Sequence, residues 1–174
     1  MKFYILAFTF LISCGTVGQA SEDLALDYNY TRGPSDPSLA KLKGPIKIAS
    51  FGDTRVVEDN RLISYDVQVE APVAEIVSAA FVQAFKSNGA TLAEEDVRFT
   101  LEGALTELNT TTKDGGVEIQ LRAKVVLKDS GRTVWENVLF SRSTGENAAE
   151  AMRASLSKLV QELLLDDYFL MEII

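Results

Sequence analysis

The most regular hydrophobic pattern lies in residues 117–128, where apolar and polar residues alternate. The apolar positions are Val117, Ile119, Leu121, Ala123, Val125 and Leu127. The intervening positions are polar apart from Val126, namely Glu118, Gln120, Arg122, Lys124 and Lys128. A period of two residues predicts a β-strand with one buried and one solvated face.

Two further strands are predicted on either side, over residues 97–108 and 133–142. Turn sequences rich in Gly, Asp and Ser separate the three segments and favour hairpins. The register of 133–142 stays open, because Val134, Val138 and Phe140 share one face and Trp135 and Leu139 the other. Buried, Trp135 belongs to the core, which is the preferred interpretation. Exposed, it would lie beside Arg122 and Lys124 in a partner-binding patch.

Two amphipathic helices are indicated by apolar residues three and four positions apart. The first opens at Ala71-Pro72, carries Phe81 in the middle of its apolar stripe, and ends at Asn88-Gly89. The second follows Ser143 and Glu146, whose spacing fits a capping box. The apolar residues 168–174 are expected to pack as the end of this helix or as a final turn.

Shorter alternating segments predict two early strands, over residues 46–51 and 62–69. The order is then strand, strand, helix, three strands, helix. Two amphipathic helices can cover one face of a mostly antiparallel sheet of about five strands. The sequence therefore predicts an α+β fold, a two-layer sandwich with one solvated sheet face.

The N-terminus carries Lys2 and an apolar run from Phe3 to Ile12. This run is shorter than the roughly 20 residues of a membrane-spanning helix and is typical of a secretory signal. It ends in Leu11-Ile12-Ser13-Cys14, which resembles the lipobox of bacterial lipoproteins. In that family the cysteine carries the lipid, so we expect a signal peptide over residues 1–13 and lipid attachment at Cys14. The alternative is ordinary cleavage after Gly18-Gln19-Ala20, before Ser21.

The region 14–44 holds two of the four prolines and is predicted to be a flexible tether, with a single domain over 45–174. Its more apolar segment, LALDYNY, either lies on the domain or stays loose. Cleavage before Cys14 leaves 16 basic and 25 acidic residues, because only Lys2 is lost from the 17 Lys and Arg. This balance disfavours nucleic acid and anionic membrane surfaces as partners. Membrane attachment would then depend on covalent lipid.

Candidate catalytic groups are few. The chain contains no histidine, and lipidation would consume Cys14, its one cysteine. Acidic residues adjoin at Glu94–Asp96 and at Asp166–Asp167, but their spacing lacks the alternate ligands of a calcium loop. We therefore expect neither metal nor cofactor, and a protein that is not an enzyme. The alternative is a soluble periplasmic protein, or an enzyme with a carboxylate site.

Short motifs along the chain are similar to those of the YajG-like bacterial lipoproteins. They are the lipobox, the Asp53-Thr54-Arg55 loop, the helix ending at Asn88-Gly89 and the segment from Asp129 to Trp135. Related architectures occur in LptE and in auxiliary lipoproteins of lipid-exporting ABC systems. The resemblance implies a non-enzymatic lipoprotein of the outer membrane that faces the periplasm and assists binding, assembly or transport in the cell envelope.

Two places are candidates for binding an envelope protein partner. One is the solvated face of the central strand, with Glu118, Gln120, Arg122 and Lys124, which is equally well explained as a plain solvated surface. The other is the loop with Asp53 and Arg55. There the preferred interpretation is structural, with a carboxylate that caps loop N–H groups and an arginine that reaches a neighbouring strand.

Overall fold

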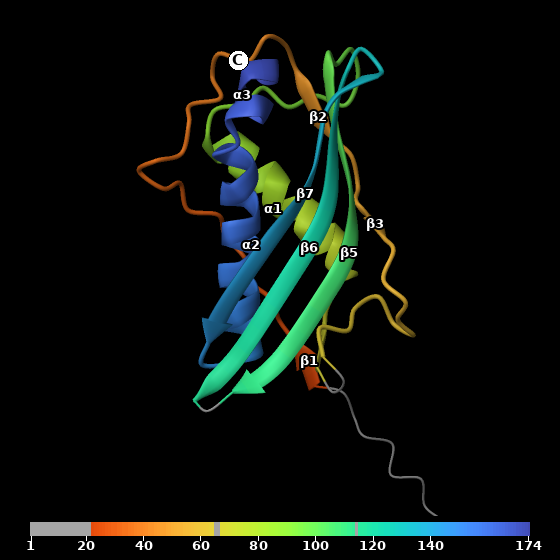
Figure 1. Cartoon of the computed structure of the whole chain (residues 1–174), viewed down its shortest axis with the longest axis vertical. Coiled ribbons are helices and arrows are strands. Elements are labelled where there is room, and N and C mark those ends of the chain that lie inside the picture. Colours follow the sequence, from red (N-terminus) through yellow and green to blue (C-terminus); the bar gives the residue numbers. More distant parts are fainter. Residues whose placement is uncertain (1–21, 65–66, 114) are drawn as a thin grey trace, which may run out of the picture.

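Three long strands form the centre of the sheet in the computed structural model, which describes residues 22–64, 67–113 and 115–174. They are β5 (Phe99–Lys113), β6 (Gly116–Asp129) and β7 (Arg132–Gly145), joined as an antiparallel meander (Figure 1). The odd-numbered apolar residues of β6 are fully buried from Ile119 to Leu127. The predicted strand over 117–128 and its buried face are therefore confirmed.

The register of β7 is set by an irregularity close to its start. Leu127 lies opposite Trp135, whereas the next residue, Lys128, lies opposite Thr133. The extra residue is a β-bulge, which shifts the alternation along the strand. Trp135 is consequently buried, with its ring 5.2 Å from that of Phe169. The core interpretation of Trp135 is confirmed, and Val138 and Phe140 face outward.

The early strands differ from the prediction. β2 (Ile46–Ile48) and β3 (Gly52–Asp53) both pair in parallel with β5, which completes the five-stranded sheet. The predicted strand 62–69 was wrong as a member of this sheet. Only β4 (Val67–Val69) is a strand, and it pairs with β1 (Glu22–Leu24) in a separate two-stranded sheet. The reason is a tight turn, because the N–H groups of Ile63 and Ser64 both donate to the carbonyl of Val67.

Helices α1 (Val73–Ser87), α2 (Ala148–Leu164) and α3 (Asp167–Ile173) cover one face of the five-stranded sheet (Figure 1). The predicted two-layer α+β architecture is confirmed. At the end of α1 the chain turns through Gly89, whose φ of +88° suits glycine far better than an L side chain. This confirms the predicted role of Asn88-Gly89.

The predicted cap of the second long helix was wrong. Ser143 still belongs to β7, because the pairing with β6 continues as far as Gly145. The side chain of Asn147 caps α2 by accepting from the Glu150 N–H, at 3.0 Å. The Glu150 carboxylate in turn accepts from the Glu146 N–H, at 3.1 Å. The N-cap therefore lies four residues later than predicted, at Asn147, after the pairing of β7 with β6 has ended.

The N-terminal segment also departs from the expected tether. From Leu24 to Gly44 it lies against the helices, and its buried apolar side chains are those of Leu26, Tyr28, Tyr30 and Leu39. Gln83 of α1 holds it in place by accepting from the Tyr30 N–H and donating to the Tyr28 carbonyl, at 3.0 and 3.1 Å. The apolar segment LALDYNY is therefore packed, because its tyrosines bury more apolar surface than a loose linker would. Residues 14–21 lie outside the described residues.

Gly103 provides a test of how closely the two layers fit. A Cβ atom built at this position would lie 2.3 Å from the ring of Phe51, which itself stacks on Phe81. We expect Gly103→Ala to lower the free energy of unfolding by about 1–3 kcal/mol, since the buried ring of Phe51 must shift to admit the added methyl group. Gly52→Ala is the matched control, because nothing lies within 4 Å of its added Cβ. Equal midpoints of urea unfolding for the two variants would contradict this.

Candidate functional site

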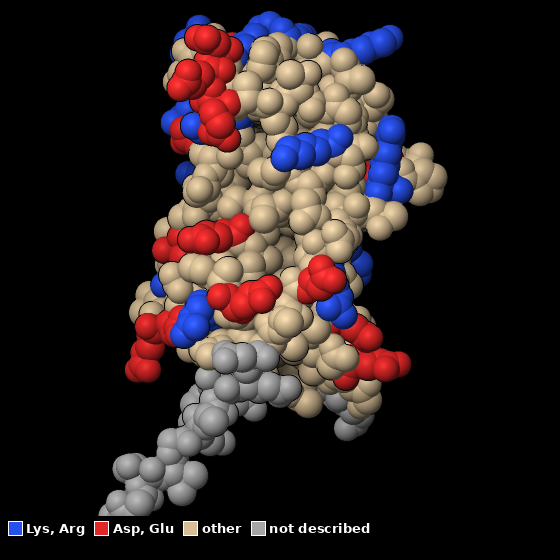
Figure 2. Space-filling model, turned by 180° about the vertical axis from the view of Figure 1, so that it is seen from behind, with Lys and Arg blue, Asp and Glu red and all other residues tan. Residues whose placement is uncertain are grey.

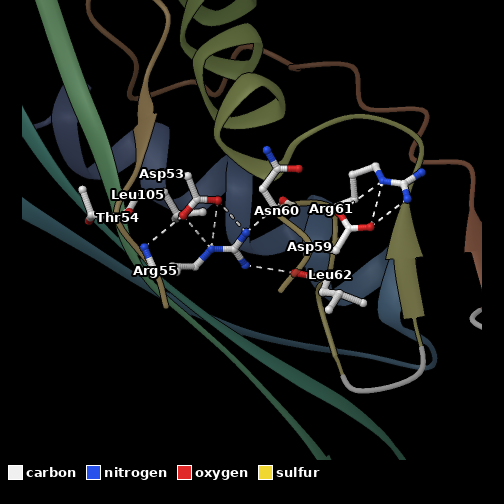
Figure 3. Close-up of polar contacts among 8 residues, drawn as sticks. All are labelled: Asp53, Thr54, Arg55, Asp59, Asn60, Arg61, Leu62 and Leu105. Carbon is white, nitrogen blue, oxygen red and sulfur yellow. Dashed lines mark hydrogen bonds and ion pairs between the residues drawn. The ribbon is translucent and has the colours of Figure 1, made fainter. Parts of the chain in front are cut away.

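The loop after β3 contains the best organised polar cluster among the described residues (Figure 3). The Asp53 carboxylate accepts from the backbone N–H of Arg55 at 3.1 Å. It also accepts from the Arg55 guanidinium, with Nε 3.0 Å from Oδ1 and Nη2 2.7 Å from Oδ2. The Asp-x-Arg sequence thus folds on itself, with a two-pronged ion pair across a single turn.

Arg55 extends this cluster to the other side of the loop. Its Nη1 donates to the Leu62 carbonyl and its Nη2 to the Asn60 carbonyl, both at 2.9 Å. The Asn60 carbonyl also accepts from the N–H of Val73, at the start of α1. Thr54 attaches the start of the loop to the sheet, because its N–H and hydroxyl both donate to the Leu105 carbonyl of β5. Arg55 therefore joins the sheet edge, the loop and the first helix.

The same motif recurs six residues later, at Asp59-Asn60-Arg61. The Asp59 carboxylate accepts from the Arg61 N–H at 2.9 Å and from its Nη2 at 2.7 Å (Figure 3). The two pairs differ in burial. Side chains in the first pair are 5% exposed for Arg55 and 13% for Asp53, against 41% for Arg61 and 34% for Asp59. Only the Asp53–Arg55 pair is a buried ion pair.

Burial and pairing act in opposite directions on Asp53. Burial by itself would raise the pKa of this carboxyl group, but the hydrogen bonds and charge of Arg55 outweigh it and lower the pKa. Asp53 is thus held as a carboxylate, and its hydrogen bonds to Arg55 stabilise the conformation of the loop. These contacts agree with the structural interpretation of the loop, since a ligand would have to displace internal partners of Arg55 to bind it.

The outer face of the sheet carries the other predicted binding residues. Arg122 and Lys124 are exposed, as expected, but each is paired with a glutamate of an adjacent strand. Nε of Arg122 lies 3.2 Å from Glu107, and Nζ of Lys124 lies 2.9 Å from Glu136. Sequence reasoning missed these partners, because they depend on the strand register. The prediction that a partner docks here stays a prediction, and the pairing reduces its electrostatic attraction.

Glu118 was wrongly assigned to the solvated face. Its side chain is buried, because it lies on the central strand between Thr111 of β5 and Thr144 of β7. Gln120, which is half-buried, donates from Nε2 to the Glu118 carboxylate at 3.2 Å. Nε of Arg142 lies 3.9 Å from the same carboxylate. At this end of the face Glu118 is therefore already engaged by neighbouring polar side chains, and the docking of a partner there stays a prediction.

The outer edge of β7 is covered by side chains. The N–H of Val138 donates to the side-chain oxygen of Asn137 at 2.8 Å, and the N–H of Phe140 donates to Glu162 at 2.9 Å. Lys158 donates to the Arg142 carbonyl at 2.9 Å. Because these groups occupy the backbone positions that an added strand would use, this edge is protected against strand addition.

The adjacent acidic residues do not form a metal site in the described part of the chain, where no group of three or more acidic, Cys or His side chains is arranged to hold a metal ion. Glu94 pairs with Lys47 at 3.0 Å. Asp166 caps α3 by accepting from the Phe169 N–H at 2.9 Å. Cys14, the predicted lipid attachment site, lies outside the described residues.

The surface charges visible in Figure 2 are mixed in sign. Figure 2, seen from behind the view of Figure 1, shows a largely uncharged surface on which both basic and acidic groups are spread along the long axis. The expectation that nucleic acid is not a partner rests on the net charge of −8 and stays a prediction. Within residues 22–64, 67–113 and 115–174, no helix combines the length and apolar character needed to cross a bilayer.

Comparison with known proteins relates the chain to others by fold. No family model matches the sequence, and no curated protein matches it either. The solved structure of XCC0632 from Xanthomonas campestris, of the DUF330 family, is similar with a TM-score of 0.66 at 13% identity. That match covers 83% of this chain and 93% of the other. The hypothetical protein CT253 of Chlamydia trachomatis has a TM-score of 0.52 at 11% identity, covering 75% and 96% of the two chains. The chain therefore shares its α+β fold with bacterial proteins of distant sequence.

Proposed function

We propose that this chain is a lipid-anchored protein of the bacterial cell envelope that acts by binding and not by catalysis. Its lipid is attached to Cys14, and it faces the periplasm from the outer membrane. The observation that carries the proposal is the sequence Leu11-Ile12-Ser13-Cys14 at the end of the apolar run. The two-layer α+β architecture predicted from the sequence pattern is the one observed, and the resemblance to YajG-like lipoproteins adds the expectation of a lipid anchor.

The packing of the N-terminal segment limits how far the domain can lie from a lipid on Cys14. β1 is the first of the described elements, and the Cα atoms of Cys14 and Glu22 can lie at most about 29 Å apart, the length of a fully extended chain of eight residues. A lipid on Cys14 would therefore hold the domain next to the membrane surface. Figure 1 places β1 at one end of the long axis and α3 at the other, so the end with α3 would face away from the membrane.

The arrangement of polar groups supports binding over catalysis. The Asp53–Arg55 cluster uses its hydrogen bonds within the loop, and the charges on the outer sheet face pair with each other. Neither leaves a positioned acid and base facing a pocket, as general acid–base catalysis requires. Outer-membrane placement is favoured because Gly15, which directly follows Cys14 and is the second residue of the mature chain, is not the aspartate that commonly retains such lipoproteins in the inner membrane.

Mass spectrometry of the chain purified from cell membranes tests the anchor. We expect a mature N-terminus at Cys14 that carries acyl chains, since two or three chains give stable membrane attachment. Cys14→Ser should move the protein from the membrane to the soluble fraction, whereas Ser13→Ala should leave it on the membrane. An unmodified N-terminus at Ser21 would refute lipid anchoring and favour the soluble periplasmic alternative.

A further inference from the structure

The exposed apolar surface of the described residues is concentrated at the C-terminal end. Eight large apolar side chains are exposed, and four of them fall within residues 165–174. We call these four the α3 stripe, and their exposed fractions are 53% for Leu165, 74% for Tyr168, 62% for Met171 and 45% for Ile174. Tyr168 and Met171 lie one turn apart on α3, Leu165 lies at the end of α2 just before it, and Ile174 is its C-cap residue. Such a cluster is costly to leave in water and marks an interaction surface.

The opposite side of α3 is fixed to the core, so the stripe is presented by a rigid element. Phe169 is buried, with its ring 5.2 Å from Trp135 and 6.2 Å from Phe85. Asp166 caps the start of the helix. At the other end, the ammonium of Lys43 donates to the carbonyls of Met171 and Glu172, at 2.7 and 3.2 Å. A preorganised surface binds with little loss of conformational entropy.

A shallow hollow beside the stripe indicates the chemistry of its occupant. The hollow has a volume of about 620 Å³ and is lined by Asp167, Leu170, Met171 and Ile174. Its lining is thus apolar apart from one carboxylate. The side chains that match both features are Lys and Arg, which have an apolar stem and a cationic head. Glu172, which is also exposed, adds a second negative charge nearby.

We propose that the α3 stripe binds a basic amphipathic segment of a protein partner, with a Lys or Arg of that segment seated against Asp167. This inference rests on the proposed function and identifies the binding surface used. The one charged group that lines the hollow is the Asp167 carboxylate, which favours a cationic group of the partner there, whereas the Lys43 ammonium lies at the other end of α3, on the carbonyls of Met171 and Glu172. The position of α3, at the opposite end from β1 in Figure 1, leaves the stripe accessible when the chain is anchored through Cys14.

The test measures fluorescence anisotropy of two labelled peptides with the purified mature chain. One peptide is an amphipathic helix of about 18 residues made of Leu and Lys, and the other has Glu in place of each Lys. We expect the Leu/Lys peptide to bind more tightly. Tyr168→Ser with Met171→Ser should weaken it by about tenfold or more, as loss of exposed interface anchors does. Asp167→Lys with Glu172→Lys should reverse the preference between the peptides.

Three control variants separate this surface from the rest of the molecule. Val138→Ser with Phe140→Ser removes the same kind of apolar surface from the sheet, and Glu94→Lys with Glu95→Lys makes the same change in net charge elsewhere. Arg122→Glu with Lys124→Glu alters the predicted sheet-face site. None of the three should weaken the Leu/Lys peptide more than about twofold. Circular dichroism should show native folding in every variant, because all the substituted side chains are exposed.

Several results would overturn the proposal. They are equal binding of the two peptides, loss of binding in a control variant alone, and no binding of the Leu/Lys peptide. Dimerisation in analytical ultracentrifugation that Tyr168→Ser with Met171→Ser abolishes would identify a second copy as the occupant. Tight binding of Cys14→Ser to phosphatidylglycerol vesicles through the stripe would identify lipid. A purified chain without lipid at Cys14 would refute the anchor but leave the peptide result valid.

Discussion

Arg55→Ala is expected to lower the free energy of unfolding by about 3–5 kcal/mol. The substitution leaves the carboxylate of Asp53, only 13% exposed, without its cationic partner. It also removes the donors to the carbonyls of Leu62 and Asn60. Removing one member of a buried pair is costly because the remaining charge stays away from water and uncompensated.

Arg61→Ala is the matched control, because it removes the same bidentate contact from the second Asp-x-Arg motif. Arg61 and Asp59 are far more exposed than the first pair, so water and salt already screen their attraction. The loss should therefore be a small fraction of that caused by Arg55→Ala. Urea unfolding followed by circular dichroism measures both variants. Comparable losses would show that burial does not distinguish the two pairs.

The pH dependence of stability gives a second readout for Arg55→Ala. Because the pKa of Asp53 is lowered in the folded state, the unfolded chain binds more protons around pH 4, and this group stabilises the fold above its unfolded pKa. That stabilisation is lost as the pH falls through the folded pKa. Without Arg55, burial remains and raises the pKa. The contribution of Asp53 in the variant should then fall as the pH increases from about 4 to 6, opposite to the wild type.

Phe81→Ala is expected to cost about 3–5 kcal/mol, because it deletes a fully buried aromatic ring between the helical layer and the sheet. The ring of Phe81 stacks on that of Phe51, with centroids 5.3 Å apart. Phe51 in turn fills the space above Gly103 of β5. A cavity at this point removes contacts in both layers, and close-packed neighbours relax only partly into it.

Lys86→Ala, on the same helix, serves as the control. Lys86 is exposed and lies off the apolar stripe, so its replacement should change the free energy of unfolding by less than about 0.5 kcal/mol. Both variants can be measured by thermal and urea unfolding. Small and equal losses at the two positions would mean that the buried face of α1 has been assigned incorrectly.

Periodic elements could be predicted from sequence because their signal is local and repeated. The alternation on β6 and the stripe on α1 are each supported by six or more positions, so single exceptions such as Val126 do not obscure them. Short elements lack this redundancy. Residues 62–69 alternate like a strand, yet a turn at Ile63 and the bonds from Arg55 leave only Val67–Val69 in a sheet.

The candidate sites divide in the same way. Asp53-Thr54-Arg55 could be recognised as a motif, but its burial and its bonds to Asn60 and Leu62 depend on how the loop closes over α1. Glu118 was expected to be exposed to solvent, because it alternates with the buried positions of its strand. The neighbouring strands and Gln120 enclose it, and alternation along one strand says nothing about those neighbours.

The amino-acid sequence by itself determined the central meander, the two long helices, the acidic balance of charge and the expectation of a lipid at Cys14. Each of these depends on the order of residues within a short window. Only the tertiary structure decided that residues 24–44 pack on the helices, that Arg122 and Lys124 are neutralised across strands, and that the α3 stripe is exposed. These features depend on contacts between segments far apart in the chain. A local pattern does not determine which face of a short apolar helix packs against the core and which stays exposed.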